Sequence, residues 1–265
     1  MYAILYDATK CVGCNQCVLA CTNVNHLDPE LPDPTTETDG LSGRRWTSIV
    51  PVPGKKRYVK KQCLHCLHPS CVSACLVGAM TKSPEGPVLY DAKKCMGCRY
   101  CMIACPVGIP RYEWDKAIPY IQKCNLCAER NAQGKKCACV EACTHGALQQ
   151  GERGDMLKRA YGLIAENPGQ YLDHVYGERE LGGTSVLYVS DVPLEQALRF
   201  PESLREVSVP EITWPVINKT PAIALTALGL LVGTYWIIER RMRLAADKEE
   251  SASGDHKPSQ TRPGR

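Results

Sequence analysis

The chain has 265 residues, of which 17 are cysteine and only one is phenylalanine. This many cysteines in a chain of this length indicate a disulfide scaffold, a zinc protein or an iron–sulfur protein. The formal net charge is +4, and no basic block before residue 239 resembles a nucleic-acid-binding patch. All cysteines lie between Cys11 and Cys143, whereas the longest apolar run lies beyond residue 220.

Short β-branched or aromatic runs predict strands at residues 3–6 and 88–90. Each is followed by a loop with three cysteines and then by a short helix that carries a fourth. Pro106 is expected to end the second of these helices. No charged segment, apolar segment or twin-arginine pair precedes Cys11, so the sequence is either a mature form or has no export signal of its own.

The cysteine-rich part is an interleaved double repeat. Residues 3–22 (AILYDATKCVGCNQCVLACT) align without a gap with residues 87–106 (PVLYDAKKCMGCRYCMIACP). Residues 71–80 (CVSACLVGAM) align in the same way with residues 139–148 (CVEACTHGAL). The chain therefore uses two kinds of cysteine segment twice, in alternation.

Sixteen cysteines fall into four groups whose spacing fits [4Fe–4S] clusters. The groups are Cys11, Cys14, Cys17, Cys21; Cys63, Cys66, Cys71, Cys75; Cys95, Cys98, Cys101, Cys105; and Cys124, Cys127, Cys139, Cys143. The third group matches the C-x2-C-x2-C-x3-C-P run of bacterial ferredoxins in every position. Gly13 and Gly97 lie between the first two cysteines of their loops, where the backbone must approach a cluster closely. These sixteen cysteines are predicted to bind the iron of four [4Fe–4S] clusters.

The fourth cysteine of a ferredoxin run ligates the neighbouring cluster, so clusters are expected in pairs that exchange one ligand. Groups two and three are adjacent in the sequence, which suggests that they pair and that groups one and four pair across them. The sets are then Cys63, Cys66, Cys71 with Cys105; Cys95, Cys98, Cys101 with Cys75; Cys11, Cys14, Cys17 with Cys143; and Cys124, Cys127, Cys139 with Cys21. The sequence leaves other pairings open.

Cys137 is the seventeenth cysteine and competes with Cys139 for the fourth group. The repeat aligns Cys139 with Cys71, so Cys137 is predicted to be a non-ligand. Zinc ribbons also use C-x2-C pairs, but tetrahedral zinc does not explain two C-x2-C-x2-C-x3-C runs. A disulfide scaffold is disfavoured because cysteines two residues apart cannot readily pair with each other.

Histidines offer no catalytic site. His65 lies between two predicted ligands and His145 follows Cys143, so either could donate a hydrogen bond to a cluster sulfur. An ordinary surface or loop role is the simpler interpretation of both. No nucleophile–base pair, phosphate loop or histidine cluster is visible, so no catalytic residue is assigned and the chain is not expected to be an enzyme by itself.

The predicted fold is α+β, a duplicated bacterial-ferredoxin-like double-dicluster module with a C-terminal single transmembrane helix. The module is expected over residues 1–150, with an irregular proline-rich insertion over 28–56. Residues 151–212, with a helix over 155–166 and a strand over 185–190, are expected to form an arm that wraps a partner. Residues 244–265 are rich in Ser, Pro and charge and are expected to be a disordered tail.

Residues 213–243 are predicted to be a transmembrane anchor with a basic flank. Residues 221–238 carry no charge, and with the lead-in from Trp214 they would span about 30 Å of hydrocarbon. Tyr235 and Trp236 stand at the far end, where interfacial aromatic residues occur. A buried core helix is the alternative. Arginines crowd the C-terminal side, which predicts a cytoplasmic C-terminus and a cluster domain on the outer, periplasmic face.

The four groups, in this order and with these gaps, resemble the four-cluster iron–sulfur subunits of membrane oxidoreductases. That family includes the beta subunits of formate dehydrogenase and dimethyl sulfoxide reductase and the iron–sulfur subunit of hydrogenase-2 type [NiFe] hydrogenase. The YVKKQC run ending at Cys63, the CRYCM run from Cys98, the GTSVL run from Gly183 and the C-terminal anchor resemble the hydrogenase branch most. The resemblance covers residues 1 to about 240.

The resemblance implies an electron relay between a catalytic subunit and an integral membrane quinone-reactive subunit in a lipid bilayer. The catalytic partner is expected to be of the hydrogenase type, with a formate dehydrogenase or other molybdopterin subunit as the alternative. No ligand position is replaced by Trp or Asp, so four [4Fe–4S] clusters are expected. Leu76 and Thr144 stand where proline often follows the fourth cysteine, which removes no ligand. The twin-arginine signal of the hydrogenase-2 subunit is absent, so export would depend on a partner.

Overall fold

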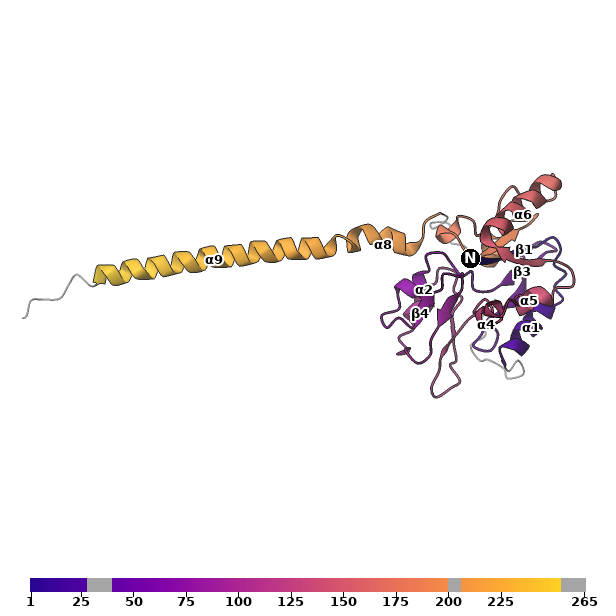
Figure 1. The fold of residues 1–265 in the computed structure, drawn as a ribbon, viewed down its shortest axis with the longest axis horizontal. Helices are drawn as coiled ribbons and strands as arrows, with labels where there is room; N and C mark the ends of the chain where they lie inside the picture. Colours follow the sequence, from indigo (N-terminus) through magenta and orange to yellow (C-terminus); the bar gives the residue numbers. More distant parts are fainter. Residues whose placement is uncertain (28–39, 200–205, 254–265) are drawn as a thin grey trace, which may run out of the picture. The chain divides into compact units, whose positions relative to one another are not determined.

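The computed structural model describes residues 1–27, 40–199 and 206–253. The chain divides after Ile212 into two compact units, each of which is described by itself. The first unit contains the strands β1 (Tyr2–Asp7), β2 (Ser48–Pro51), β3 (Tyr58–Lys61), β4 (Met80–Lys82), β5 (Val88–Tyr90), β6 (Arg111–Tyr112), β7 (Ile121–Gln122), β8 (Leu148–Glu152) and β9 (Val186–Val189). Its helices are α1 (Gln16–Val24), α2 (Ser70–Ser73), α3 (Tyr100–Ile103), α4 (Ala128–Ala132), α5 (Ala138–Glu141), α6 (Arg153–Glu166), the 3-10 turn η1 (Glu180–Gly182) and α7 (Glu195–Leu198). The result is an α+β fold of small sheets and short helices (Figure 1).

The sequence repeat is visible as two equivalent structural halves. In one half β4 pairs antiparallel with β5, with Met80 opposite Tyr90. In the other half β8 pairs antiparallel with β1, with Leu148 opposite Tyr6. The two interleaved sequence repeats relate these pairs, β5 to β1 and β4 to β8. The strands predicted at residues 3–6 and 88–90 are confirmed, and the second pair joins segments from the two ends of the cysteine-rich part.

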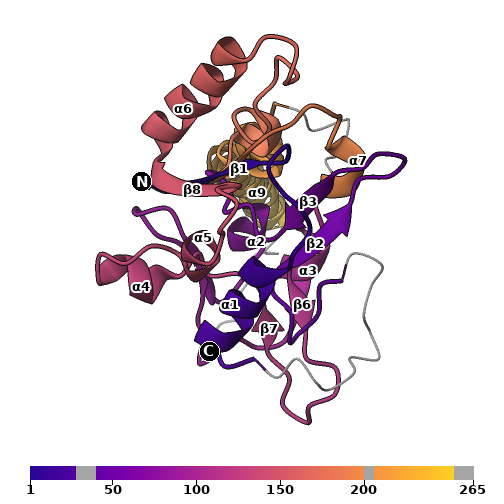
Figure 2. The ribbon, with the colours of Figure 1, turned by 90° about the vertical axis from the view of Figure 1, so that its right-hand side faces the viewer.

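The short helices follow the same symmetry. Helix α2 packs against α3 in one half, and α5 packs against α1 in the other (Figure 2). Each of these helices carries a cysteine of the repeat, because each begins close to the third cysteine of its group. The helix–helix contacts therefore bring cysteines that are far apart in the sequence close together in space.

Much of the segment 151–212, expected to form an arm that wraps a partner, packs against the start of the chain; the wrapping of a partner stays a prediction. Strand β9, near the predicted 185–190, pairs in parallel with β1 and lies fully buried in the three-stranded sheet β8–β1–β9. Helix α6 covers this sheet through Leu163 and Ala160, which pack against Leu5 and Leu187. Parallel pairing buries both faces of a strand, and the apolar VLYV run of β9 is suited to that position.

The insertion expected over residues 28–56 is also partly regular. Its residues 28–39 lie outside the described residues. Strand β2 follows and pairs antiparallel with β3, with Val50 opposite Val59. The equivalent hairpin of the other half is β6–β7. Long-range pairing with β3 overrides the irregular local signal of the proline-rich segment.

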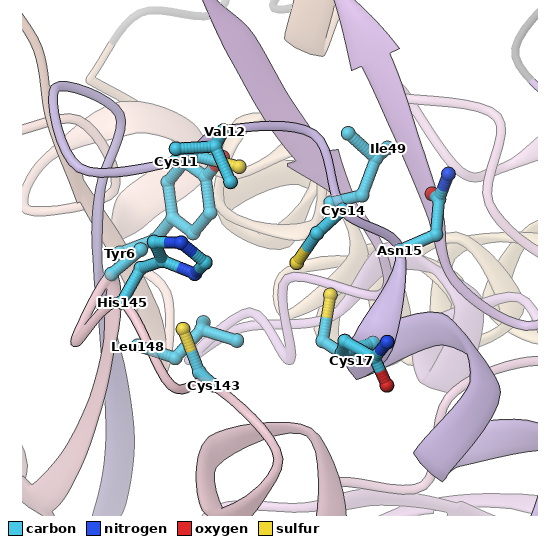
Figure 3. Close-up of a pocket in the computed structure, with 12 residues that line it drawn as sticks. Tyr6, Cys11, Val12, Cys14, Asn15, Cys17, Ile49, Cys143, His145 and Leu148 are labelled. Carbon is cyan, nitrogen blue, oxygen red and sulfur yellow. The ribbon is translucent and has the colours of Figure 1, made fainter.

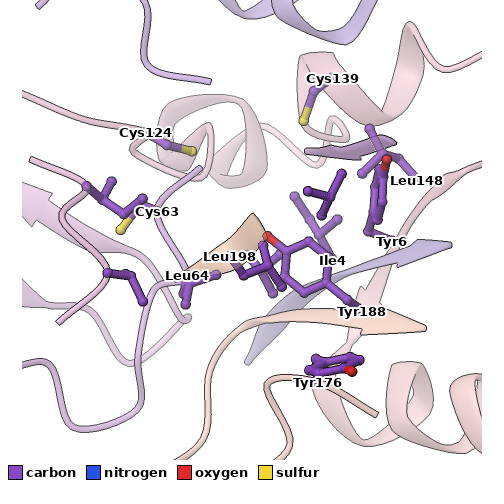
Figure 4. Close-up of a cluster of buried hydrophobic side chains, with 14 of the residues drawn as sticks. Ile4, Tyr6, Cys63, Leu64, Cys124, Cys139, Leu148, Tyr176, Tyr188 and Leu198 are labelled. Carbon is purple, nitrogen blue, oxygen red and sulfur yellow. The ribbon is translucent and has the colours of Figure 1, made fainter. Parts of the chain in front are cut away.

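Cysteines are part of the main core of the first unit. Cys63, Cys124 and Cys139 are buried together with Ile4, Tyr6, Tyr188 and other apolar side chains (Figure 4). The rings of Tyr6 and Tyr188 meet edge to face at 5.5 Å. With one phenylalanine in the chain, thiols occupy space that aromatic side chains fill in most cores.

The second unit is dominated by one long helix. Helix α8 (Val209–Ile217) lies across the division between the units, and α9 runs over Thr220–Ser253. Residues 209–249 contain a stretch long and apolar enough to cross a membrane, with a mean hydropathy of 1.8 and none of it buried. The alternative of a core helix buried by the rest of this chain is therefore not observed among the described residues.

The tail expected to be disordered from residue 244 is helical as far as Ser253. Alanines and alternating charges favour the helix there, and Arg243 pairs with Glu239 one turn earlier. Residues 254–265 lie outside the described residues.

Candidate metal centres

A cavity in the half built from β1 and β8 is lined by Cys11, Cys14, Cys17 and Cys143, which we call the Cys11 set (Figure 3). The first two lie in the loop after β1, Cys17 lies in the first turn of α1, and Cys143 closely follows α5. Their sulfur atoms point into the shared space between apolar walls that include Ile49 and Leu148. The structure thus brings Cys143 to the first group, as expected for ligand exchange.

A second set of thiols lies deeper. Cys124, Cys127 and Cys139 are joined by Cys21 from α1, and we call these four the Cys124 set. Burial raises the pKa of Cys21 to about 11, and the charges of Cys139 and Cys127 raise it further. Burial also raises the pKa of Cys124, with the charge of Cys21 as the next raising contribution.

The other half of the repeat holds two more sets with the same exchange. Burial is the largest cause that raises the pKa of Cys66, and the charges of Cys63, Cys105 and Cys71 raise it further. Burial, and next the charges of Cys95, Cys75 and Cys98, raise the pKa of Cys101 to about 11. We call Cys63, Cys66, Cys71 and Cys105 the Cys63 set, and Cys95, Cys98, Cys101 and Cys75 the Cys95 set. The fourth cysteines therefore cross between the two sets.

Backbone amides are directed at several of these sulfur atoms. The amides of Ala79 and Met80 donate to Cys75 Sγ at 3.2 and 3.4 Å. The amides of Gly97, Ile109 and Leu126 donate to Cys95, Cys105 and Cys124, each at 3.4 Å. Hydrogen bonds to the charged form stabilise a thiolate, which is the form that binds metal.

The loops adopt the conformation that close approach to a metal centre requires. Gly13 and Gly97 have φ values of +76° and +75°, as expected from their place between cysteines. Asn15 and Arg99, which the repeat aligns, also have positive φ values of +59° and +62°. Asparagine tolerates this conformation, but arginine does not favour it, so the sequence alone gave no signal for Arg99. Equal backbone conformations show that the two loops are built alike.

The residues present fit iron–sulfur clusters. No group of three or more His, Cys, Asp or Glu side chains within residues 1–27, 40–199 and 206–253 is arranged to hold a single metal ion. A cubane instead takes one thiolate at each of four irons, so its ligands surround a space rather than one point. The lining of the Cys11 set has this form.

A buried histidine supports the same fit. The His65 side chain is fully buried, and its Nδ1 accepts a hydrogen bond from the Val88 amide at 2.8 Å. The proton therefore lies on Nε2, which is buried without a hydrogen-bond partner among the described residues. Burial, with the charges of Lys123 and Lys82, lowers the pKa of His65, so the ring is neutral. This buried N–H without a partner, in a residue between Cys63 and Cys66, fits a missing acceptor, whereas His145 is exposed and lines the cavity of the Cys11 set.

Cys137 is held by interactions of its own. Its amide donates to Gln150 Oε1 at 2.7 Å, and its thiol donates to the Leu126 carbonyl at 3.3 Å. Asn131 Nδ2 lies 3.9 Å from the sulfur. These contacts give Cys137 a structural place beside the Cys124 set, and a hydrogen bond from its thiol lowers the pKa of Cys127. That Cys137 is a non-ligand stays a prediction.

We expect Cys137→Ala to keep the full iron content and Cys139→Ala to lose one cluster, about four irons per chain. The Cys137 thiol donates to the Leu126 carbonyl, and the sequence repeat aligns Cys139, not Cys137, with the predicted ligand Cys71. Iron analysis of the anaerobically purified variants measures the difference. Equal iron loss in both variants, or loss only in Cys137→Ala, would contradict the assignment.

Comparisons with known proteins agree with this site. Residues 55–153 match the family model described as a 4Fe-4S dicluster domain. A protein of Nitratidesulfovibrio vulgaris whose name states no function is 42% identical over 264 residues, covering 95% of this chain and 70% of that protein. Hydrogenase-2 operon protein HybA of Shigella flexneri is 37% identical over 231 residues, covering 72% of this chain and 70% of that protein. The iron-sulfur subunit of nitrate-inducible formate dehydrogenase of Escherichia coli is 34% identical over 199 residues, covering 71% of this chain and 67% of that subunit.

Proposed function

This chain belongs to the family of 4Fe-4S dicluster iron–sulfur subunits that also includes HybA and the corresponding subunits of formate dehydrogenase and dimethyl sulfoxide reductase, and from that premise we propose that it relays electrons through four [4Fe–4S] clusters. The relay runs between a catalytic subunit of the [NiFe] hydrogenase type and a quinone-reactive membrane subunit. Like its relatives, the chain is a non-catalytic electron-transfer subunit of an oxidoreductase complex.

The observation that carries the proposal is the gathering of cysteines from distant segments: α1 contacts α5, α2 contacts α3, and Cys63, Cys124 and Cys139 share one core cluster. The charges of the thiols support an order for the four sets. After burial, the charge of Cys139 is the largest contribution raising the pKa of Cys17, which links the Cys11 set to the Cys124 set. The charge of Cys63 raises the pKa of Cys124, which links the Cys124 set to the Cys63 set. The charge of Cys101 raises the pKa of Cys71, which links the Cys63 set to the Cys95 set.

These three links support a single row of sets: Cys11, Cys124, Cys63 and Cys95. A row gives an electron one route with an entry at one end and an exit at the other. When bound, the clusters would supply the redox chemistry. The protein's own groups hold the thiolates, exclude water with apolar walls and supply amide donors to sulfur.

Helix α9 is proposed as a single transmembrane anchor. Its apolar stretch is exposed along its whole length in this chain, which is costly in water and favourable in a bilayer. Arg240 lies over the ring of Trp236 at 5.5 Å, an arrangement suited to the interface of a membrane. The arginines on this side favour a cytoplasmic C-terminus, with the cluster unit on the outer face.

Anaerobic purification from membranes tests the function. We expect the chain to co-purify with a catalytic subunit and a membrane subunit, and its clusters to be reduced when H2 is supplied. Reduction by formate but not by H2 would assign the same relay to a molybdopterin oxidoreductase, against the hydrogenase partner proposed here. Recovery of iron-loaded protein that no co-purifying subunit can reduce would overturn the relay.

A further inference from the structure

The Cys11 and Cys95 sets lie closer to the surface of the first unit than the other two sets. Cys63 and Cys124 are buried, whereas Cys14 is exposed and Cys98 is half-buried. The repeat aligns Cys14 with Cys98, so these are equivalent surface positions of the two halves. In the relay proposed above, electrons enter the chain at one of these two surfaces and leave it at the other.

The two surfaces share a backbone plan and differ in side chains. Five exposed residues that flank the ligands of the Cys95 set are apolar or aromatic, and we call them the Cys95 face: Leu76, Val77, Met96, Tyr100 and Ile103. The repeat aligns them, in the same order, with five exposed residues that we call the Cys11 face: Thr144, His145, Val12, Gln16 and Leu19. Three positions that are apolar or aromatic at one end of the row are therefore polar at the other.

An arginine is held beside the Cys95 face by two aromatic rings. The Arg99 guanidinium lies 5.5 Å from the ring centroid of Tyr112 and 5.1 Å from that of Trp114. In the part of the chain that the structure describes, no carboxylate pairs with Arg99, and the aligned residue of the other half is the uncharged Asn15. Stacking restricts the guanidinium, so a partner's carboxylate would bind it at a lower cost in conformational entropy. Arginine, tryptophan and tyrosine are also the residues that most often dominate the binding energy of protein interfaces.

The chain leaves the first unit in the same half of the repeat. The unit ends at Ile212, and the preceding Glu211 has its Oε1 3.6 Å from His68 Nε2. Ser208 is buried against Gly182, where an added Cβ would lie 3.0 Å from the Ser208 Cβ. Ser208 and Glu211 exchange hydrogen bonds that cap α8, with the Ser208 amide donating to Glu211 Oε2 at 3.3 Å and the Glu211 amide donating to Ser208 Oγ at 3.4 Å. The exit is thus fixed beside the loop that leads into α2.

This exit relates the proposed anchor to one end of the row. The uncharged stretch of α9 begins at Pro221, nine residues after Ile212, which is about 14 Å along a helix. Helix α2, which follows the exit loop, contacts α3, and α3 carries Tyr100 and Ile103 of the Cys95 face. The chain therefore runs to the bilayer from the half that carries the apolar face. A surface of this chemistry next to a membrane fits a partner that is itself a membrane protein.

We propose that the Cys95 face, together with Arg99, is the docking surface for the integral membrane subunit, and that electrons pass between the two subunits at the Cys95 set. The inference rests on the proposed function, since it requires a relay with two ends. The partner would cover Leu76 and Ile103, which are 73% and 83% exposed in this chain, and would present a carboxylate to Arg99. The more polar Cys11 face is left to the catalytic subunit.

Site-specific photo-cross-linking in native membranes tests which subunit meets which face. A photoreactive phenylalanine analogue replaces Ile103 of α3 in one variant and the aligned, exposed Leu19 of α1 in the matched control. The analogue at position 103 should cross-link to an integral membrane protein that co-purifies with the chain, and the analogue at position 19 should not. Cross-linking from position 103 to the catalytic subunit, to lipid only or to nothing would overturn the proposal, as would equal cross-linking of the membrane protein from both positions.

A second experiment gives the Cys95 face the residues of the other end in one variant, Leu76→Thr with Arg99→Asn and Tyr100→Gln. The aligned positions already carry these residues, and Asn15 has a φ of +59° where Arg99 has +62°, so iron content should be unchanged. In the detergent-solubilised complex, we expect H2-dependent reduction of an added short-chain quinone to fall by about tenfold or more. Reduction of the clusters by H2 should stay at the rate of the unmodified complex.

Unchanged quinone reduction in the iron-loaded triple variant, or an equal fall in the reduction of its clusters by H2, would overturn the proposal and leave the relay intact. If the triple variant loses iron, the cross-linking pair alone decides, because it leaves Leu76, Arg99 and Tyr100 in place. Absence of clusters from the unmodified protein, or clusters that no co-purifying subunit reduces, would instead refute the proposed function.

Discussion

Replacing Cys75 with alanine is expected to remove the cluster of the Cys95 set and to leave the cluster of the Cys63 set, although Cys75 belongs to the second cysteine group of the sequence. After burial and the charge of Cys95, the charge of Cys75 raises the pKa of Cys101, so the Cys75 thiol lies with the later group. The contact of α2 with α3 holds it there, and two backbone amides point at its sulfur. Iron analysis should show a loss of up to about four irons per chain.

Double variants identify the cluster that is lost. Cys75→Ala combined with Cys95→Ala should lose no more iron than the more affected single variant, because both changes act on one site. Cys75→Ala combined with Cys71→Ala should lose two clusters, and EPR should show two signals missing. The reverse pattern, with Cys75 and Cys71 acting as one site, would show that each sequence group binds its own cluster and that the exchange is wrong.

The double substitution Leu230→Arg with Leu231→Arg, in the middle of the uncharged stretch 221–238 of α9, is expected to release the chain from membranes when it is produced without partner subunits. Both leucines are exposed in the apolar stretch. An arginine at the centre of a membrane helix opposes insertion by about 2.5–3.5 kcal/mol, so two oppose it by roughly twice that. Membrane fractionation with detection of the chain in pellet and supernatant measures the effect.

Leu244→Arg is the matched control because Leu244 is an exposed leucine of the same helix that follows the arginine cluster. The Leu244→Arg variant should stay in the membrane fraction, because position 244 lies outside the apolar stretch and a further positive charge there does not enter the bilayer. Full membrane recovery of the double variant, or equal release by the control, would mean that α9 does not insert.

The cysteine groups and their strands were predictable because their signals are local. Short, regular spacings identified the sixteen cysteines, and the repeat located β1 and β5 beside them. The interpretation of Cys137 also followed from the repeat. These features depend mostly on residues within one loop or one helical turn, where sequence patterns carry the most information.

Long-range pairings were not predictable in the same way. Strand β9 was expected as a strand, but nothing local shows that it pairs in parallel with β1, which lies at the opposite end of the first unit's sequence. Strand β2 was hidden in a proline-rich segment for the same reason. Ligand exchange was inferred from the ferredoxin motif and the pairing of the groups from adjacency alone. The structure adds the helix contacts α1–α5 and α2–α3.

Lys60 shows a different limit. Two lysines in a row within YVKKQC look solvent-exposed, because charged side chains are almost never fully buried unless they are paired. Lys60 is nevertheless fully buried, and the charges of Cys139, Cys17, Cys124 and Cys21, from segments distant from β3 in the sequence, raise its pKa against the effect of burial. Sequence reasoning therefore predicted the ligands but did not predict this buried lysine.

The most direct measurement is the iron and acid-labile sulfide content of anaerobically purified, full-length protein, combined with the number of electrons that it accepts. Four clusters predict about sixteen irons, about sixteen sulfides and about four electrons per chain. A chain that held zinc instead, or far fewer irons, or iron that takes up no electrons, would contradict the account at its base.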